Sequence, residues 1–478
     1  MYTNFGLFID GEWRQASEGK TEPVISPVSE SPLGEVPGAG VVDTQAAIDA
    51  AHMALARWST TPAHDRAEAL HAIANEMIRR TEEAARMISS ETGKPLAQSR
   101  REWGLSIDQF RWYAEEARRI YGRIIESRVP SGRFEVSHEP VGVVAAFTAW
   151  NFPASLLARK IAPALAAGCP VIARPSSQTP GTAMVMVDCC RAGNLPPGTV
   201  NLVVGSTDAT YRPIMASRLV RKVSLTGSTR IGQQMIRDAA DTMKKVSMEL
   251  GGNAPLIVYD DADLDMALNT AAQAKFANTG QVCVAPDRFF IHDRLHDAFV
   301  KGFVTRAKAI RLGDGLDDGV DMGPLINGHR LAEMEAIVAD AVAGGAKVNT
   351  GGQRPAGFNN GYFYEPTVLT EVTDDMRVMV DENFGPIAAI TRFSSDDEVL
   401  TRANASDMGL AAYAFTRSPA RARRTVAELK AGMVGINSTA LAAAEAPFGG
   451  TNFSGMGREG GSEGILDYLD VKLAQVVF

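Results

Sequence analysis

One cysteine in a turn-forming segment is the first candidate for chemistry in this chain. The segment from 278 to 288 reads NTGQVCVAPDR and sets Cys283 among Gly280, Gln281 and Pro286. Because glycine and proline interrupt regular structure, Cys283 is expected in a loop rather than on a helix face. A thiol is nucleophilic only as thiolate, which needs nearby amides, cations or a base. Taken alone, this segment favours a structural role for Cys283. A reactive thiol at this position would require such groups from other segments of the chain.

A glutamate at the end of a predicted strand is a candidate base. The segment from 248 to 255 reads MELGGNAP, so Glu249 is followed by Gly251 and Gly252. Such a turn can aim a carboxylate into a cleft, although a solvated glutamate is the alternative. Beside a reactive thiol, Glu249 could activate the water that hydrolyses a thioester.

An asparagine between a strand and a helix is a candidate for stabilising negative charge. The segment WNFP runs from Trp150 to Pro153. The amide of Asn151, with a backbone amide beside the nucleophile, could hold a developing oxyanion. Local sequence supports a helix cap at Asn151 equally well.

Glycine-bearing segments could line a cofactor site. LTGSTRIG, from Leu225 to Gly232, predicts a strand that passes through Gly227 into a helix. Helix N-termini favour phosphate, but the absence of a GxGxxG pattern makes this a weak signal. DENFGP at 381–386 and APFGGTNFSGMGREG at 446–460 are loops of the kind found at active sites, and physical reasoning alone gives them no role.

The elements that must position these residues begin with helices. Helical spacing predicts helices from Asp43 to Trp58, from Pro62 to Glu91 and from Ser99 to Tyr121. A strand-like segment follows from Arg133 to His138. The first 120 residues are therefore expected to be mainly helical.

Five apolar runs separated by helical patterns then predict a parallel, doubly wound sheet. The predicted strands are Val141 to Phe147, Val171 to Arg174, Val200 to Val204, Lys222 to Leu225 and Lys245 to Met248. Helices are expected from Leu156 to Ala167 and from Thr179 to Arg191. Dinucleotides commonly bind at the carboxyl ends of such strands.

A second alternating series predicts a second α/β domain, with a cleft between the two. Its expected strands are Leu256 to Tyr259, Arg288 to Ile291, Ile387 to Phe393 and Ala411 to Phe415. The last residues, Val471 to Phe478, form an apolar strand with no obvious place in either core. Such a strand could add to the sheet of another subunit.

Composition sets limits on the class of protein. A chain of 478 residues exceeds one core, so two or three domains are expected. The net charge of −8, with both signs interspersed, argues against nucleic-acid binding. The apolar stretch Val141 to Trp150 is too short to cross a membrane, and no secretory signal is apparent. Of the four cysteines, Cys169, Cys189 and Cys190 are expected as buried apolar side chains, which fits a cytoplasmic setting. No metal site is expected.

Taken together and in this order, the segments resemble the NAD(P)-dependent aldehyde dehydrogenase superfamily along essentially the whole chain. The match rests on ELGG at Glu249, GQxC at Cys283, and the motifs WNFP, NFGP and PFGGxxxSGxGRE. WYAEEARRIYG, ARKIAPALAAGCP and GMVGIN are most similar to the succinate-semialdehyde dehydrogenase branch.

The resemblance implies an α/β fold of the aldehyde dehydrogenase type. A Rossmann-type cofactor domain would take residues 1–121 and 141–251, and an α/β catalytic domain residues 252–447. Residues 122–140 and 448–478 would form a small β oligomerisation arm, which implies a homodimer or a homotetramer.

The same resemblance assigns catalytic roles. Cys283 would attack the aldehyde to give a thiohemiacetal, while Asn151 and the Cys283 backbone amide hold the oxyanion. Hydride transfer to the nicotinamide would leave a thioester. Glu249 would activate water to release the acid, with Lys160 and Glu459 as a proton relay.

The resemblance also places the cofactor, NAD or NADP. Ser228 resembles the pyrophosphate contact, Glu382 the ligand of the nicotinamide ribose, and Phe384 packs nearby. Further contacts are implied for Trp150, Gly227 and Leu250.

At the adenosine end the sequence departs from the usual pattern of the family. Arg174 replaces the family's lysine, and Ser177 stands where many NAD-preferring relatives carry glutamate. Without that acid the 2′-phosphate is not repelled, and an arginine can pair with it, so NADP is expected to be accepted.

The substrate pocket departs from the succinate-semialdehyde branch as well. Arg159 matches one of two carboxylate-binding arginines, but the second falls at Ala277 and the accompanying serine at Ala442. Phe152 and Phe448 are further expected substrate contacts. We therefore expect a longer, aromatic or differently charged aldehyde with at most one anionic group near Arg159. A purely structural ion pair of Arg159 is the alternative.

Other functions remain to be compared. Succinate-semialdehyde dehydrogenase proper is one, and a dehydrogenase of a phosphorylated aldehyde, which would need a cationic pocket, is another. A coenzyme-A-acylating enzyme typically lacks the general base, whereas Glu249 is present. A non-catalytic protein of this fold would have no chemical need for Cys283, Glu249 and Asn151 together.

Overall fold

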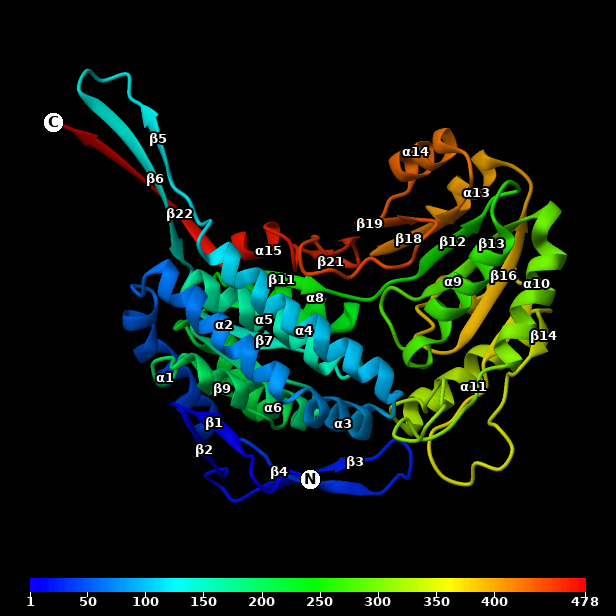
Figure 1. Cartoon of the computed structure of the whole chain (residues 1–478), viewed down its shortest axis with the longest axis horizontal. Helices are drawn as coiled ribbons and strands as arrows, with labels where there is room; N and C mark the ends of the chain where they lie inside the picture. Colours follow the sequence, from blue (N-terminus) through cyan, green and yellow to red (C-terminus); the bar gives the residue numbers. More distant parts are fainter.

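Two open β-sheets with helices on both faces make up most of the molecule (Figure 1). The computed structural model describes all residues, 1–478. The α/β fold expected from the sequence is confirmed. No helix is long and apolar enough to cross a membrane.

The first sheet has eight strands, and its central five are parallel as predicted. In order across the sheet they are β2 (Glu12–Arg14), β1 (Leu7–Ile9), β9 (Val200–Leu202), β8 (Val171–Arg174), β7 (Val143–Phe147), β10 (Val220–Thr226), β11 (Lys245–Glu249) and β21 (Gly455–Met456). Because helices cover both faces, the central strands are nearly continuous apolar runs.

Two layers of helices bury this sheet. One face packs against α5 (Pro153–Ala167) and α6 (Pro180–Cys190), which are covered in turn by α2 (Ala63–Arg79), α3 (Thr81–Thr92) and α4 (Leu96–Ala117). The other face packs against α1 (Val41–Trp58), α7 (Thr207–Ala216) and α8 (Thr229–Ala240). The strands alternate their side chains between these two cores.

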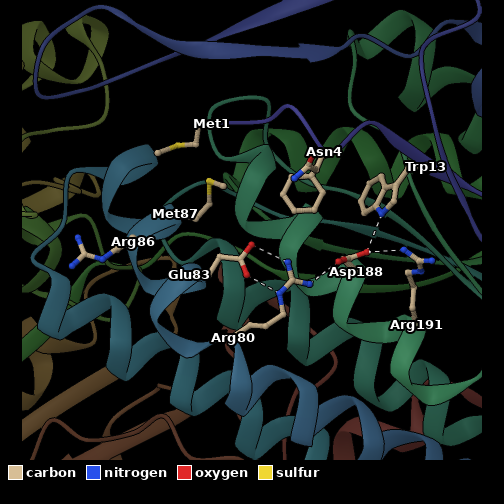
Figure 2. A pocket seen from close by; sticks show the side chains of 10 residues that line it. Met1, Asn4, Trp13, Arg80, Glu83, Arg86, Met87, Asp188 and Arg191 are labelled. Atoms are coloured by element: carbon tan, nitrogen blue, oxygen red, sulfur yellow. Dashed lines mark hydrogen bonds and ion pairs between the residues drawn. The ribbon is translucent and has the colours of Figure 1, made fainter.

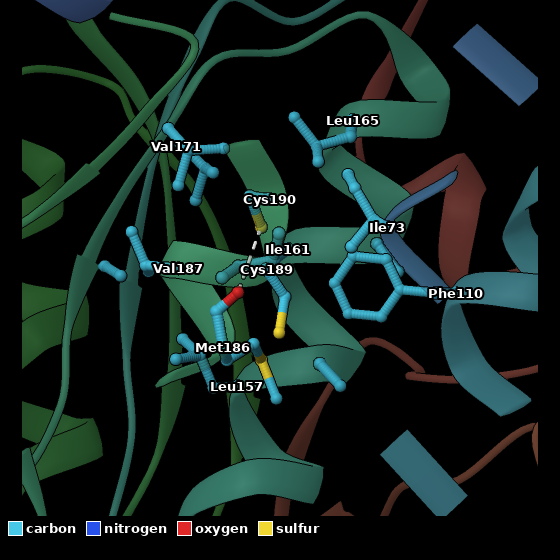
Figure 3. Close-up of a cluster of buried hydrophobic side chains, with 14 of the residues drawn as sticks. Ile73, Phe110, Leu157, Ile161, Leu165, Val171, Met186, Val187, Cys189 and Cys190 are labelled. Carbon is cyan, nitrogen blue, oxygen red and sulfur yellow. Dashed lines mark hydrogen bonds between the residues drawn. The ribbon is translucent and has the colours of Figure 1, made fainter. Parts of the chain in front are cut away.

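Three cysteines belong to the interior rather than to chemistry. Cys189 and Cys190 lie among the apolar side chains of the α2–α6 core (Figure 3). Cys169 is buried in the same core, and all three are free thiols. The expectation of small buried apolar side chains is confirmed.

The single helix predicted from Pro62 to Glu91 is wrong, because the chain breaks at Arg80 between α2 and α3. The Arg80 guanidinium pairs with Glu83 and reaches Asp188 of α6 at 2.6 Å (Figure 2). Asp188 also accepts a hydrogen bond from the indole of Trp13. These contacts form one wall of a surface cleft of about 500 Å³.

The expectation of a mainly helical N-terminal part omitted the strands at its beginning. The hairpins β1–β2 and β3–β4 precede the first helix, with β3 at Thr21–Ile25 and β4 at Pro32–Pro37. In β3 and β4 only Val24, Val36 and Pro37 are buried, so these strands lack the apolar alternation that predicts a strand.

The second sheet has seven strands, all parallel except the edge strand β14. In order across the sheet they are β14 (Lys347–Thr350), β15 (Thr367–Thr370), β16 (Ile387–Phe393), β13 (Pro286–His292), β12 (Ala254–Val258), β18 (Ala411–Phe415) and β19 (Met433–Ile436). The four predicted strands are confirmed, whereas β14, β15 and β19 were not predicted. One face packs against α9 (Leu264–Phe276) and α10 (Asp293–Lys308), the other against α11 (Gly328–Ala343) and α13 (Asp396–Ala403).

A three-stranded antiparallel sheet projects from the body of the molecule (Figure 1). It consists of β5 (Arg123–Glu126), β6 (Gly132–Pro140) and β22 (Leu469–Val477). The C-terminal strand therefore has a place within its own chain, paired with β6 along its full length. Ile124, Leu473 and Phe478 remain exposed on this arm.

Short elements complete the chain. They are α12 (Arg377–Val380), α14 (Pro419–Glu428), α15 (Glu463–Leu466), β17 (Met408–Gly409) and β20 (Thr451–Asn452), with 3-10 turns at Arg191–Gly193 and Ala277–Gly280.

Candidate active site

Cys283 lies in a turn just before β13, as the loop expectation required. The preceding residues Asn278, Thr279 and Gly280 all have positive φ angles, of 47°, 59° and 71°. A β-branched residue rarely adopts this conformation, and Thr279 is held in it by a hydrogen bond of 2.9 Å to Gly323 O. Glycine is required at 280, because a Cβ there would lie 2.1 Å from Gly385 O. This close approach brings the DENFGP loop against the cysteine turn.

The Cys283 thiol is half-buried and held in its protonated form. Its pKa is raised to about 12, chiefly by burial and then by the nearby carboxyl groups of Glu382 and Glu249, while Arg159 acts in the opposite direction. Formation of a thiolate therefore needs a group that accepts the proton, and these two carboxyl groups are the acids close enough to influence it.

Asn151 points its side-chain amide at the segment that carries the nucleophile. Asn151 Nδ2 donates to Gln281 O at 3.1 Å, and its second N–H has no such partner. The residue that caps α5 is Phe152, without a side-chain hydrogen bond, so the interpretation of Asn151 as a helix cap is wrong. Its own carbonyl accepts from Lys94 Nζ at 2.7 Å and from Asn278 Nδ2 at 3.0 Å.

Glu249 is the last residue of β11 and is buried, with an exposed fraction of 3%. The alternative of a solvated surface glutamate is therefore wrong. Its Oε2 has no hydrogen-bond partner, and the other oxygen lies so close to Gly449 that a Cβ there would come within 2.7 Å. Burial, and next the charge of Glu459, raise the pKa of Glu249 well above its ordinary value.

Lys160 and Glu459 meet beside Glu249 although 299 positions separate them in the sequence. Lys160 Nζ pairs with Glu459 Oε1 and donates to Thr226 Oγ1 at 2.8 Å. Both side chains of this pair are buried. The charge of Lys160 lowers the pKa of Glu249, whereas that of Glu459 raises it.

Arg159 follows the turn of Asn151 on α5 and is also buried. Its guanidinium lies 4.3 Å above the centre of the Phe448 ring, and Nη1 has no hydrogen-bond partner. No carboxylate lies within ion-pair distance of it, so the alternative of a structural ion pair has no support. The stacking orients Arg159 and leaves an N–H donor unused.

A cavity of about 510 Å³ lies against the cysteine turn. Its apolar wall consists of Phe152, Phe276, Val282, Val284 and Tyr413. Its polar side includes Gln98, Arg101, Arg306, Asp321 and Thr439.

Two features of this cavity bear on substrate choice. Ala277 lines it, so the cavity has no arginine at that position. Sequence reasoning missed Arg101 of α4 and Tyr413 of β18, which also line it, because neither belongs to a recognisable motif. Tyr413 Oη donates to Val284 O at 2.8 Å and so supports the turn just after Cys283.

The carboxyl ends of the first sheet offer a place that fits a dinucleotide. Helix α8 begins after Ser228, whose hydroxyl makes no capping hydrogen bond, so the hydroxyl and the first amides of the helix have no partner within it. A Cβ at Gly232 would lie 2.4 Å from Leu250, which shows how closely Leu250 packs on α8. An uncapped helix N-terminus after Gly227 suits phosphate.

The DENFGP loop provides the groups expected near a nicotinamide. Glu382 accepts a hydrogen bond of 3.0 Å from the Gly252 amide, and burial raises its pKa to about 7. The Phe384 ring meets Trp150 edge-on at 5.6 Å. Arg330 donates to Phe384 O at 3.1 Å and so holds the loop.

Arg174 ends β8 and is held by neighbouring loops. Its Nη2 donates to Gly205 O at 3.0 Å, and its Nε to Thr210 Oγ1 at 3.3 Å. Ser177, three residues on, is exposed. The Arg174 guanidinium retains further N–H donors that these two contacts do not use.

Comparison with known proteins agrees with this geometry. The sequence model of the Aldehyde dehydrogenase family matches residues 13–474. The chain is 44% identical to the 3-sulfolactaldehyde dehydrogenase of Pseudomonas putida, over 97% of this chain and 95% of that protein. It is 42% identical to the succinate-semialdehyde dehydrogenase (NADP(+)) GabD of Escherichia coli, over 97% and 96%.

Solved structures show the same similarity. The succinate-semialdehyde dehydrogenase from Burkholderia pseudomallei superposes with a TM-score of 0.97 at 41% identity, covering 99% of this chain and 98% of that one. A betaine aldehyde dehydrogenase from Staphylococcus aureus in complex with NAD+ gives a TM-score of 0.96 at 34% identity, covering 98% and 94%.

Proposed function

Because the chain belongs to the aldehyde dehydrogenase family, it is an oxidoreductase that acts on aldehydes, and we propose that the residues gathered around Cys283 carry out its reaction. That reaction is the NAD(P)-dependent oxidation of an aldehyde to the carboxylic acid through a cysteine thiohemiacetal and thioester.

In the first half-reaction, Cys283 Sγ forms a bond to the aldehyde carbon. The thiol proton passes to Glu249, whose raised pKa and free Oε2 suit it as an acceptor near neutral pH. The carbonyl oxygen becomes an oxyanion that accepts hydrogen bonds from the Cys283 backbone N–H and from Asn151 Nδ2. The bound dinucleotide supplies the hydride acceptor for the oxidation.

In the second half-reaction, Glu249, having first passed the thiol proton to the buried pair of Lys160 and Glu459, takes a proton from water so that the resulting hydroxide attacks the thioester. The acid is released and the Cys283 sulfur leaves as thiolate. The buried pair of Lys160 and Glu459 lies beside Glu249 and can pass its proton onward.

The cofactor would be held along the carboxyl ends of the first sheet. Gly227, Ser228 and Leu250 would hold the pyrophosphate at the start of α8. Trp150, Glu382 and Phe384 would hold the nicotinamide half. Arg174 and Ser177 would face the adenosine ribose, and the free N–H donors of Arg174 support acceptance of NADP.

The proposed substrate is an aldehyde with one anionic group. The observation that carries this proposal is Arg159, a buried cation with no ion pair and an unused N–H donor close enough to influence the Cys283 thiol. A buried guanidinium without an anion is costly, so an anionic substrate group would supply its missing partner. The names of similar proteins, 3-sulfolactaldehyde, glutarate-semialdehyde and succinate-semialdehyde dehydrogenase, describe substrates of this class.

The test is the appearance of NAD(P)H with a panel of aldehydes. Succinic and glutaric semialdehyde, aliphatic, aromatic and sulfonated aldehydes would each be run with NAD and with NADP, beside a Cys283→Ala control. We expect anionic aldehydes to be preferred, with a substrate other than succinic semialdehyde best. A wide preference for succinic semialdehyde would favour that dehydrogenase proper and show that Ala277 and Ala442 are compensated. Inactivity with every aldehyde would support the non-catalytic alternative.

We also propose that the arm of β5, β6 and β22 joins subunits into a dimer or a dimer of dimers. Its exposed apolar side chains Ile124, Leu473 and Phe478 support this role. The division into a cofactor domain (1–121, 141–251), a catalytic domain (252–447) and the arm (122–140, 448–478) belongs to the same proposal. Light scattering should give a mass of two or four chains, and Leu473→Lys should lower it. The free thiols fit a cytoplasmic setting.

A further inference from the structure

A buried ion pair outside the residues assigned above connects α4 to the turn of Asn151. Lys94 precedes α4, Glu102 lies within it, and each has an exposed fraction of 2%. Lys94 Nζ and Glu102 Oε2 are 2.6 Å apart. An ion pair of this kind costs desolvation energy and contributes little net stability, so its position in the fold calls for a reason other than stability.

Lys94 holds the beginning of the turn. Its ammonium donates to Asn151 O at 2.7 Å and lies 4.0 Å from the centre of the Phe152 ring. The same carbonyl also accepts from Asn278 Nδ2, which belongs to the cysteine turn. The backbone of Asn151 is thus fixed between α4 and the segment of the nucleophile.

Glu102 holds the end of the turn. Its Oε1 accepts hydrogen bonds from the amides of Ala154 at 2.8 Å and Ser155 at 3.3 Å, in the first turn of α5. These amides have no partner within the helix, and the residue that caps α5 provides no side-chain bond. A carboxylate here is also favoured by the helix dipole.

We propose that Lys94 and Glu102 are positioning residues for oxyanion binding. They fix the backbone from 151 to 155 at both ends, and so fix where Asn151 Nδ2 lies relative to Cys283. This inference rests on the role proposed above for Asn151. Glu102 also lines the cavity that lies against the cysteine turn, but in the proposed mechanism neither residue contacts the reacting atoms, and both act through the turn.

A second buried pair provides a matched control. Lys275 Nζ and Asp287 Oδ1 are 2.6 Å apart, and both residues are buried. Asp287 Oδ2 accepts a hydrogen bond of 3.1 Å from the backbone N–H of Asn383. This pair therefore supports the DENFGP loop on the cofactor side. Breaking it should raise the KM for the dinucleotide, whereas breaking the Lys94 pair should not.

The experiment compares Lys94→Met, the double variant Lys94→Met/Glu102→Gln, and Lys275→Met in the full-length enzyme. For Lys94→Met we expect kcat to fall about 10²-fold, the cost of a misplacement on the order of 1 Å, with the KM for the dinucleotide unchanged. The double variant removes the unpaired carboxylate but keeps an acceptor for the α5 amides. It should recover the Tm lost in Lys94→Met without recovering kcat.

The inference would be overturned if the kcat of Lys94→Met stayed within about two-fold of that of the unmutated enzyme. Recovery of kcat together with Tm in the double variant would also overturn it. So would equal changes of kcat and of the KM for the dinucleotide in Lys94→Met and Lys275→Met. Asn151→Ala separates this inference from the proposed function. If Asn151→Ala keeps full kcat, the oxyanion role itself fails. If Asn151→Ala is impaired while Lys94→Met is not, only the positioning role fails.

Discussion

The reaction centre and the adenosine end of the cofactor site differ in the solvent exposure of their polar side chains. Around Cys283 the charged residues Glu249, Lys160, Glu459 and Arg159 are all buried, and they come from segments far apart in the chain. At the adenosine end, Ser177 is exposed at the surface.

This difference in exposure predicts how strongly a substitution affects neighbouring residues. Charges in a buried centre interact strongly because little water screens them, so one change alters the protonation and position of its neighbours. At an exposed position water screens the same change to about 1 kcal/mol or less. Substitutions in the centre should therefore change the rate of the chemistry, and those at the adenosine end only the choice between cofactors.

The largest effect is expected for Glu249→Gln, which keeps the shape of the base and removes its basicity. Turnover should fall about 10³-fold, the scale of general-base catalysis. A burst of NAD(P)H should remain but be slow, because the variant also lacks the acceptor of the thiol proton; the thioester then forms slowly and is hydrolysed poorly. Stopped-flow absorbance measures both phases.

Glu116→Gln is a suitable control for that change, since Glu116 is a buried glutamate on α4 that pairs with Arg119 and has no role in the proposed mechanism. It should keep normal turnover. If Glu249→Gln turned over at the rate of this control, the assignment of the base would be wrong.

The next effect concerns Arg159→Met, which removes the unpaired cation and keeps much of the side-chain volume. For an anionic aldehyde kcat/KM should fall about 10²-fold, because a charge-assisted contact worth roughly 2–3 kcal/mol is lost. For a neutral aldehyde of equal length the loss should be only a few-fold, on the scale of indirect effects on the thiol. An equal loss with both aldehydes would contradict a role in anion binding.

Much of this contrast could be predicted from the sequence. The parallel strands are continuous apolar runs, and the chemical residues stand where these strands end: Glu249 closes β11, and Asn151 stands between β7 and α5. Catalytic residues commonly lie in loops that rigid strands and helices hold in place, so their sequence motifs indicate both the fold and the site.

Other features gave no local signal. The helical pattern of the sequence continues through Arg80, where the helix ends in the structure, and the contact of Arg80 with Asp188 on a different helix has no local signal. The terminal strand β22 pairs with β6, which lies more than 300 positions earlier, and its largely exposed residues indicate no burial. Lys94 and Glu102 are charged residues of types usually found at the surface, and only the tertiary structure shows that they are buried beside the Asn151 turn.

A smaller effect within the centre is expected for Glu459→Gln. The negative charge of Glu459 is the second largest cause, after burial, of the raised pKa of Glu249. Removing it lowers that pKa, so Glu249 ionises at lower pH and the acidic limb of the kcat profile should move to lower pH. The plateau should also fall about tenfold, because the relay loses its acceptor.

This prediction is checked by measuring kcat from roughly pH 5 to pH 9 for both enzymes. The unmutated enzyme, and the conservative variant Glu459→Asp, which keeps the charge, should show the limb at higher pH. A limb that stays in place or moves upward in Glu459→Gln would mean that Glu459 does not act on Glu249.

The smallest effect is expected at the adenosine end, for Ser177→Glu. A carboxylate at this exposed position would repel the 2′-phosphate held by Arg174, so the ratio of kcat/KM for NADP over NAD should fall about five-fold, the effect of roughly 1 kcal/mol between screened charges. The kcat with saturating NAD should not change, because the position is remote from Cys283 in the proposed mechanism. Ser177→Gln has the same size without the charge and should leave the ratio nearly unaltered. If Ser177→Gln changed the ratio as much as Ser177→Glu, size rather than charge would control the choice of cofactor, and the contrast drawn between a buried centre and a screened adenosine end would not rest on electrostatics.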